Sequence, residues 1–296
     1  MTDLDGEIGR LIGREKLPPD FASTVKSFYV PIVRAIESLH SKLKRTTVIG
    51  ICGPQGSGKT TAAEFLQLLL NDTGLRTARF SIDDLYLTRA ERAMLARDVH
   101  PLLQTRGPPG THDVAMGLEL VARLSTAATN AETPIPRFDK SVDDRAPQPS
   151  WPVFVGRADM ILFEGWCVGA LPQPAVELVQ PINALERDED RGGIWRRFVN
   201  DQLAGSYHNL FRKIDYLIMI EPPSFDCVLR WRTLQEAKLR ERAPNAPHVM
   251  SNEQITRFIM FYERVSRHLL AEMPARAEAV LNIDIGHKVT GLRFKV

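Results

Sequence analysis

The chain has 296 residues, of which 44% are hydrophobic and 25% are charged, a composition typical of a globular protein with one or two domains. A net charge of +2 provides no bulk attraction to nucleic acid or to an anionic membrane, so we expect neither as a partner. The acidic start lacks an apolar segment, no run approaches membrane-spanning length, and the three cysteines match no zinc or redox spacing, which together predict a cytoplasmic protein.

The first 45 residues predict a helical arm. A polar stretch ends in the turn sequence Leu17-Pro18-Pro19-Asp20, and apolar residues then recur at helical spacing through 21–44. We expect this arm, residues 1–45, to pack on one domain that spans residues 46–296.

The most specific motif follows the first predicted strand, residues 46–52, and precedes a helix predicted over 61–70. It fits the phosphate-binding pattern G-x-x-x-x-G-K-[ST] at every fixed position, and a chance glycine-rich turn would lack this strand-and-helix context. Backbone N–H groups in such a loop face phosphate oxygens, its lysine reaches the β- and γ-phosphates, and its hydroxyl ligates Mg²⁺. We expect nucleotide contacts from Gly53, Pro54, Gln55, Gly56, Ser57, Gly58, Lys59, Thr60 and Thr61.

Two carboxylates, Asp83 and Asp84, follow the second predicted strand, residues 76–82. Ligands of open α/β sheets bind beyond the carboxyl ends of the strands, where one carboxylate can accept a hydroxyl proton and the other can orient Mg²⁺. The alternative is a structural cap at the start of the following helix.

Basic residues gather in the two loops that follow. Helices are predicted over 88–97 and 113–127, with a Gly/Pro-rich loop between them, and residues 129–157 are proline-rich without a clear period. The basic set would suit a small anionic substrate, although a solvated loop surface has the same composition. Its members are Arg106, His112, Arg137, Lys140 and Arg145.

A third strand, residues 159–163, delivers Glu164 beside the phosphate-binding loop. An acid at the end of an apolar strand is the Walker-B arrangement, in which the carboxylate holds Mg²⁺ through water. A capping or salt-bridging glutamate is the structural alternative. Residues 185–203, which follow, are mostly helical in pattern.

The fourth and fifth strands are predicted over 214–220 and 279–284, with helices over 223–241 and 252–272 between them. Strands that alternate with helices predict an α/β fold with a parallel sheet of about five strands and helices on both faces. Arg230 and Arg232 on the basic helix could belong to a lid over a transferring phosphate, at about 223–250, or to an exposed charged face.

Together these residues resemble the D-glycerate 3-kinase family, P-loop kinases related to uridine kinase, phosphoribulokinase and pantothenate kinase. The resemblance covers roughly residues 46–285, although Asp143-Asp144-Arg145 stands where the family has Gly-Asp-Arg. Its motifs lie at 53–61, 81–88, 106–113, 136–141, 144–145, 163–166 and 230–236.

The resemblance implies a P-loop NTP hydrolase-like fold with a helical lid and substrate loops at about 100–157. It implies that ATP and Mg²⁺ are the cofactors and that D-glycerate is the acceptor. Asp83 would be the catalytic base, assisted by Lys59, Arg230 and Arg232, and Mg²⁺ would lie near Thr60, Glu164 and Asp84. Two alternatives remain: a sugar, nucleoside or pantothenate kinase of the same superfamily, and an ATP-binding regulatory protein without a small-molecule acceptor.

Overall fold

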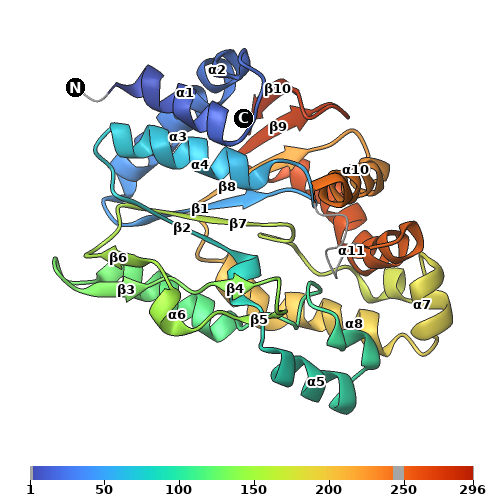
Figure 1. The fold of residues 1–296 in the computed structure, drawn as a ribbon. Helices are drawn as coiled ribbons and strands as arrows, with labels where there is room; N and C mark the ends of the chain where they lie inside the picture. Colours follow the sequence, from blue (N-terminus) through green and yellow to red (C-terminus); the bar gives the residue numbers. More distant parts are fainter. Residues whose placement is uncertain (1–2, 243–249, 296) are drawn as a thin grey trace.

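The computed structural model describes residues 3–242 and 250–295 and contains a central six-stranded sheet with helices on both faces (Figure 1). The strand order is β10-β9-β8-β1-β7-β2, in which all neighbours run parallel except β9 and β10. The strands are β1 (Thr47–Cys52), β2 (Thr77–Ser81), β7 (Met160–Gly165), β8 (Tyr216–Glu221), β9 (Ala279–Ile283) and β10 (Val289–Phe294).

The five predicted parallel strands are confirmed, and β10 is an additional strand that the sequence pattern did not indicate. It pairs antiparallel with β9 after a tight turn, in which the Asp284 N–H donates to the Lys288 carbonyl over 2.9 Å. Because β10 lies at the edge of the sheet, most of its side chains are at least partly exposed, and it lacks the apolar run that marks the buried strands.

Helices cover both faces of the sheet (Figure 1). One face carries α1 (Leu4–Arg14), α2 (Phe21–Thr24), α3 (Val30–Leu43) and α4 (Lys59–Asp72). The opposite side of the molecule carries α5 (Arg89–Asp98), α6 (Val114–Thr126), α7 (Ala184–Glu189), α8 (Ile194–Gln202), α9 (His208–Phe211) and α11 (Asn252–Glu272), while α10 (Asp226–Arg242) packs against α11.

Both faces of the central strands are buried, which explains their continuous apolar sequences. All residues of β1 and β7 are buried, and successive side chains point to opposite faces. Ile49 and Leu162 pack under α4, whereas Ile161 and Phe163 belong to the core on the opposite face. This double burial holds the carboxyl ends of β1 and β7 side by side.

The N-terminal helices pack directly on α4. Ile8 of α1 and Ile32 of α3 are buried in the same apolar core as Phe65 of α4. Arg14 of α1 also forms an ion pair of 2.7 Å with Glu64 of α4. The N-terminal residues therefore support the helix that begins at the phosphate-binding motif.

The proline-rich segment 129–157 contains two short antiparallel pairs. They are β3 (Glu132–Pro134) with β6 (Val153–Val155), and β4 (Phe138–Asp139) with β5 (Asp144–Arg145). Strands of two or three residues are too short to produce a recognisable period in the sequence. The tight β4–β5 hairpin places three of the predicted substrate residues on one small unit.

Among the described residues, no helix is long and apolar enough to cross a membrane.

Candidate active site

The phosphate-binding motif forms the turn between β1 and α4, as its context predicted. Gly58 precedes α4 with φ 83°, a left-handed conformation that glycine adopts without strain, and no side chain caps the helix. The first N–H groups of α4 therefore remain available to an anion, and the helix dipole favours one there. Lys59, Thr60 and Thr61 are the first residues of this helix.

Close packing fixes the course of this loop. A Cβ on Gly53 would lie 2.6 Å from the Ser57 hydroxyl oxygen, so a larger residue would force the loop open. Ser57 is 4% exposed, and its hydroxyl has no hydrogen-bond partner among the described residues. On the outer side, a Cβ on Gly56 would lie 3.0 Å from Cβ of Trp231 on α10.

Glu164 lies at the end of β7, between β1 and β2 in the sheet. It is 4% exposed, and its Oε1 accepts a hydrogen bond of 3.0 Å from the Thr60 hydroxyl. Oε2 is buried and has no hydrogen-bond partner among the described residues. An unsatisfied carboxylate oxygen beside a P-loop hydroxyl fits a Mg²⁺ ion and its waters.

No group of three His, Cys, Asp or Glu side chains gathers to hold a metal ion within residues 3–242 and 250–295. Mg²⁺ does not need such a cage, because it commonly binds one or two carboxylates together with substrate phosphates and waters. The donor set around Glu164 and Thr60 therefore suits a Mg²⁺ ion that arrives with a nucleotide.

Asp83 and Asp84 occupy a short 3₁₀ turn directly after β2. The Asp84 carboxylate accepts from the Ser81 N–H over 3.0 Å and so caps the turn, which is the structural alternative that the sequence left open. Asp83 instead accepts 2.8 Å and 2.5 Å hydrogen bonds from the Tyr86 hydroxyl and Lys140 Nζ. Asp83 thus contacts the substrate loop without capping the turn.

The two carboxyl groups differ in their affinity for protons. Burial favours the neutral acid of Asp83, but the charges of Lys140 and Lys59 outweigh it and lower its pKa to about 2. Burial raises the pKa of Asp84 against the opposing charge of Arg137, and the charges of Asp83 and Glu164 act in the same direction as burial. Asp83 is therefore the more readily ionised of the two.

Four of the five predicted substrate residues form ion pairs with aspartates, and two of these pairs involve Asp83 and Asp84. Lys140 pairs with Asp83, and Arg137 Nη1 lies 3.0 Å from Asp84 Oδ2. The remaining pairs are Arg106 with Asp143 and, at 3.3 Å, Arg145 with Asp113. The structure thus brings these residues together at the end of β2.

His112 differs from the other four because it is a buried neutral ring. Its Nδ1 lies 2.6 Å from the Tyr207 hydroxyl, which itself accepts a 2.8 Å hydrogen bond from the Gly110 N–H. The Tyr207 hydroxyl can donate its own proton to Nδ1, which would leave the ring proton on Nε2, a nitrogen with no partner among the described residues. Burial lowers the pKa of His112 to about 3 against the opposing charge of Asp83.

An aromatic residue of α11 also anchors the first substrate loop. Tyr262 is buried and donates a 3.2 Å hydrogen bond to the Arg106 carbonyl, and Trp166 donates to the Gly107 carbonyl over 3.2 Å. Gly107 has φ 127°, and a Cβ there would lie 2.0 Å from the Tyr262 hydroxyl. Only glycine fits this close approach.

The predicted lid begins at α10, although residues 243–249 of its expected range lie outside the described residues. Arg230 is exposed, and the Arg232 guanidinium lies 5.4 Å from the centre of the Phe258 ring. Trp231, between them, is buried against the P-loop, and its ring lies 4.5 Å from the His287 ring at an angle of 30°. The sequence analysis missed Trp231, although an aromatic residue within a basic helix could have indicated a contact with the P-loop.

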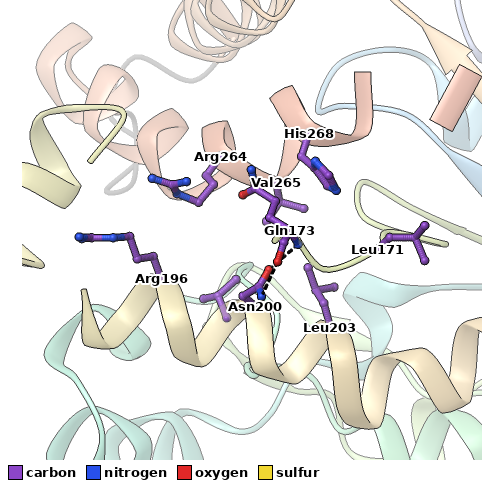
Figure 2. Close-up of a pocket in the computed structure, with 9 residues that line it drawn as sticks. Leu171, Gln173, Arg196, Asn200, Leu203, Arg264, Val265 and His268 are labelled. Carbon is purple, nitrogen blue, oxygen red and sulfur yellow. Dashed lines mark hydrogen bonds between the residues drawn. The ribbon is translucent and has the colours of Figure 1, made fainter. Parts of the chain in front are cut away.

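A pocket between α8 and α11 is distinct from this site (Figure 2). It has a volume of about 10 Å³, room for about one water molecule. Figure 2 shows the guanidinium groups of Arg196 and Arg264 pointing away from it, and a Gln173–Asn200 contact crosses its centre. Both arginines pair with buried carboxylates, so the pocket is structural in character.

Known proteins resemble the chain over most of its length, although no family model matches it. It is 34% identical to "Uncharacterized kinase mug58" of Schizosaccharomyces pombe over 78% of this chain and 83% of that protein. It is also 34% identical to the chloroplastic D-glycerate 3-kinase of Arabidopsis thaliana, over 87% of this chain and 58% of that longer protein.

Solved structures agree with this relationship. A D-glycerate 3-kinase from Cryptococcus neoformans var. grubii superimposes with a TM-score of 0.72 and 25% identity, over 89% of this chain and 98% of that one. The YGR205w protein shares the fold, with a TM-score of 0.68 and 24% identity over 94% and 97% of the two chains. The chain is therefore a P-loop kinase. It belongs to the family that contains D-glycerate 3-kinase.

Proposed function

We propose that the protein transfers the γ-phosphoryl group of ATP to a hydroxyl of a small anionic metabolite, and that this metabolite is D-glycerate, which would yield 3-phosphoglycerate. One observation supports this most directly. The phosphate-binding loop, Glu164 and Asp83 lie together at the carboxyl end of the sheet, and Lys140 contacts Asp83 there. The named relatives direct the choice of acceptor to D-glycerate.

On the donor side, the N–H groups of the loop and of α4 would bind the β- and γ-phosphates, with Lys59 beside them. Thr60, Glu164 and Asp84 would hold Mg²⁺ together with phosphate oxygens and waters. Mg²⁺ supplies neutralisation of charge on the phosphates. Arg230 and Arg232 would stabilise charge on the transferring group from the lid helix.

On the acceptor side, Asp83 would accept the hydroxyl proton as the new O–P bond forms and the bond to ADP breaks. Lys140 must leave Asp83 for the hydroxyl to approach. If Lys140 then pairs with the acceptor carboxylate, Asp83 loses the charge that lowers its pKa and becomes a better base. Binding of the anionic acceptor would thus prepare the base.

The other members of the basic set complete the acceptor site in this proposal. Arg106, Arg137 and Arg145 are only partly exposed, and guanidinium groups bind carboxylates in bidentate geometry. His112 would contribute the N–H of Nε2 as a neutral donor.

A substrate panel scored by ADP release tests the proposal. The panel contains D-glycerate, uridine, pantothenate, a hexose and a reaction without acceptor, and ³¹P NMR identifies the phosphorylated hydroxyl. We expect strong stimulation by D-glycerate alone. Activity on uridine, the hexose or pantothenate but not on glycerate would reject the acceptor, and ATP turnover that no acceptor stimulates would favour the regulatory alternative.

A further inference from the structure

We propose that Arg92, which the sequence analysis did not single out, is the positioning residue of the acceptor site. Together with Asp143 it joins the three chain segments that carry the acceptor residues and orients the Arg106 guanidinium. The inference rests on the proposed function, because that proposal assigns these segments to the acceptor.

Arg92 lies on α5 and is 1% exposed, which is rare for an arginine. Its Nε donates to the Leu87 carbonyl over 3.2 Å, and Nη1 donates to the Gln104 carbonyl over 3.0 Å. Its Nη2 lies 2.8 Å from the Asp143 carbonyl oxygen and 2.9 Å from Oδ2 of the same residue. One buried guanidinium thus contacts three separate chain segments.

Each of these segments leads directly to acceptor residues. Leu87 follows the turn that carries Asp83 and Asp84, and Gln104 stands two residues before Arg106. Asp143 lies in the β4–β5 hairpin, between Lys140 and Arg145. A displacement of Arg92 would therefore alter the spacing of the whole acceptor set, while the P-loop on β1 and α4 would keep its own supports.

Asp143 extends this connection to Arg106. One of its carboxylate oxygens pairs with Arg92 and the other with Arg106. The Phe138 ring adds a second constraint, since the Arg92 and Arg106 guanidinium carbons lie 5.9 Å and 5.6 Å from its centre.

The backbone of Asp143 is consistent with a functional carboxylate. Its φ is 57°, a left-handed conformation that favours glycine and costs a non-glycine residue on the order of 1 kcal/mol. The carboxylate also neutralises a buried cation, and removal of one partner of such a pair is strongly destabilising. Asp143 is therefore held in place by Arg92, and it orients Arg106 while leaving that side chain's other N–H groups for a substrate.

Arg264 on α11 provides a matched control. It is 6% exposed, pairs with Glu186 and donates to the carbonyls of Glu177 and Gln180. Like Arg92, it is therefore a buried arginine that pairs with one carboxylate and donates to two other backbone carbonyls. The segment that it holds contains no predicted acceptor residue. Its loss would therefore destabilise the fold without a specific effect on the acceptor.

The first test compares Arg92→Lys with Arg264→Lys. Lysine keeps the charge but lacks the planar fork that reaches several acceptors at once. We expect Arg92→Lys to raise the acceptor KM about tenfold and to leave the ATP KM within about twofold. Arg264→Lys should lower Tm comparably without moving the acceptor KM. An equal KM change in both variants, or none in Arg92→Lys, would overturn the inference.

The second test needs no turnover. Amide hydrogen exchange in 104–113 and 136–146 should be faster in Arg92→Lys than in the wild type, and unchanged there in Arg264→Lys. Unchanged exchange in Arg92→Lys would reject the positioning role. If the wild type phosphorylates no member of the panel, the proposed function fails, and hydrogen exchange still decides whether Arg92 organises these loops.

If Arg92→Lys does not fold, the same two measurements are made on Asp143→Asn. Asparagine keeps the size and one acceptor oxygen but removes the charge shared by the two arginines. We expect the same directions of change in acceptor KM and in exchange. A variant with wild-type values for both would overturn the inference.

Discussion

The donor and acceptor halves of the site are built by different physical means. In the donor half, the P-loop and Glu164 stand at the ends of β1 and β7. These two strands are buried and paired with each other, which fixes the positions of the P-loop and Glu164. On the acceptor half, side chains on loops are held by ion pairs such as Lys140 with Asp83. In the proposed mechanism, an anionic acceptor must displace such ion pairs, whereas the first N–H groups of α4 have no side-chain cap and are available to a phosphate.

This comparison predicts which kinetic constant each substitution changes. Changes at the donor half and at the reacting atoms should lower kcat, because those groups act in the transition state. Changes in the loops should raise the acceptor KM, because their side chains exchange partners when the acceptor binds.

The largest effect is expected for Asp83→Asn, at the boundary of the two halves. Asparagine keeps the shape but cannot take the hydroxyl proton, so kcat should fall about 10³-fold. ATP affinity, measured by calorimetry with a non-hydrolysable analogue, should stay unchanged because Asp83 lies outside the loop. A variant with full turnover would disprove the role of Asp83 as base.

A smaller loss is expected for Glu164→Gln, which tests the donor half alone. The amide would weaken Mg²⁺ binding through its waters, so kcat should fall about 10²-fold at limiting Mg²⁺. A titration of MgCl₂ should restore part of the activity, while the acceptor KM should remain near the wild-type value. If the acceptor KM rises as much as the Mg²⁺ requirement, the two halves are not independent.

The two halves also differ in how far the sequence predicted them. The P-loop, the five parallel strands and Glu164 at the end of β7 follow from local patterns, because strand, turn and helix are neighbours in the chain. Arg92 and Asp143 could not be found in this way, since their importance comes from contacts between residues 51 positions apart. A buried arginine on a helix looks like any other charged helix residue in the sequence.

His112 shows a second limit of sequence reasoning. The sequence pattern places His112 among the basic residues. In the structure, its burial and the Tyr207 hydroxyl make it a neutral donor. Tyr207 lies 95 residues further along the chain, and no local pattern connects it to the loop at 106–113.

Lys140→Met tests the acceptor half through its ion pair. We expect the KM for an anionic acceptor to rise about tenfold, since a charge-assisted contact is lost. The pH dependence of the folding stability should reveal the Lys140–Asp83 ion pair independently of the kinetics. Asp83 has a pKa of about 2 in the folded protein against an ordinary value of 3.8, so its ionised form stabilises the fold above about pH 4, and this contribution disappears as the pH falls through 2.

Thermal scans between pH 2 and pH 7 measure this second effect. The wild type should exceed Lys140→Met in Tm near neutral pH, and the difference should shrink as the pH approaches 2. A constant difference across this range would show that Lys140 supports the fold by packing alone, and the acceptor half would then resemble the donor half in rigidity.

The smallest effect is expected for Tyr207→Phe. Loss of the hydroxyl removes the donor to His112 Nδ1 and the acceptor for the Gly110 N–H, so the ring proton is no longer confined to Nε2. We expect the acceptor KM to rise about threefold to tenfold, which corresponds to one hydrogen bond, with kcat and the ATP KM almost unchanged. ¹⁵N NMR of the imidazole should show a mixture of tautomers in place of one.

Tyr29→Phe, at a buried tyrosine on the opposite face of the sheet, is the control. If the variant keeps a single tautomer and an unchanged acceptor KM, then His112 is oriented by its stacking on Tyr86 alone.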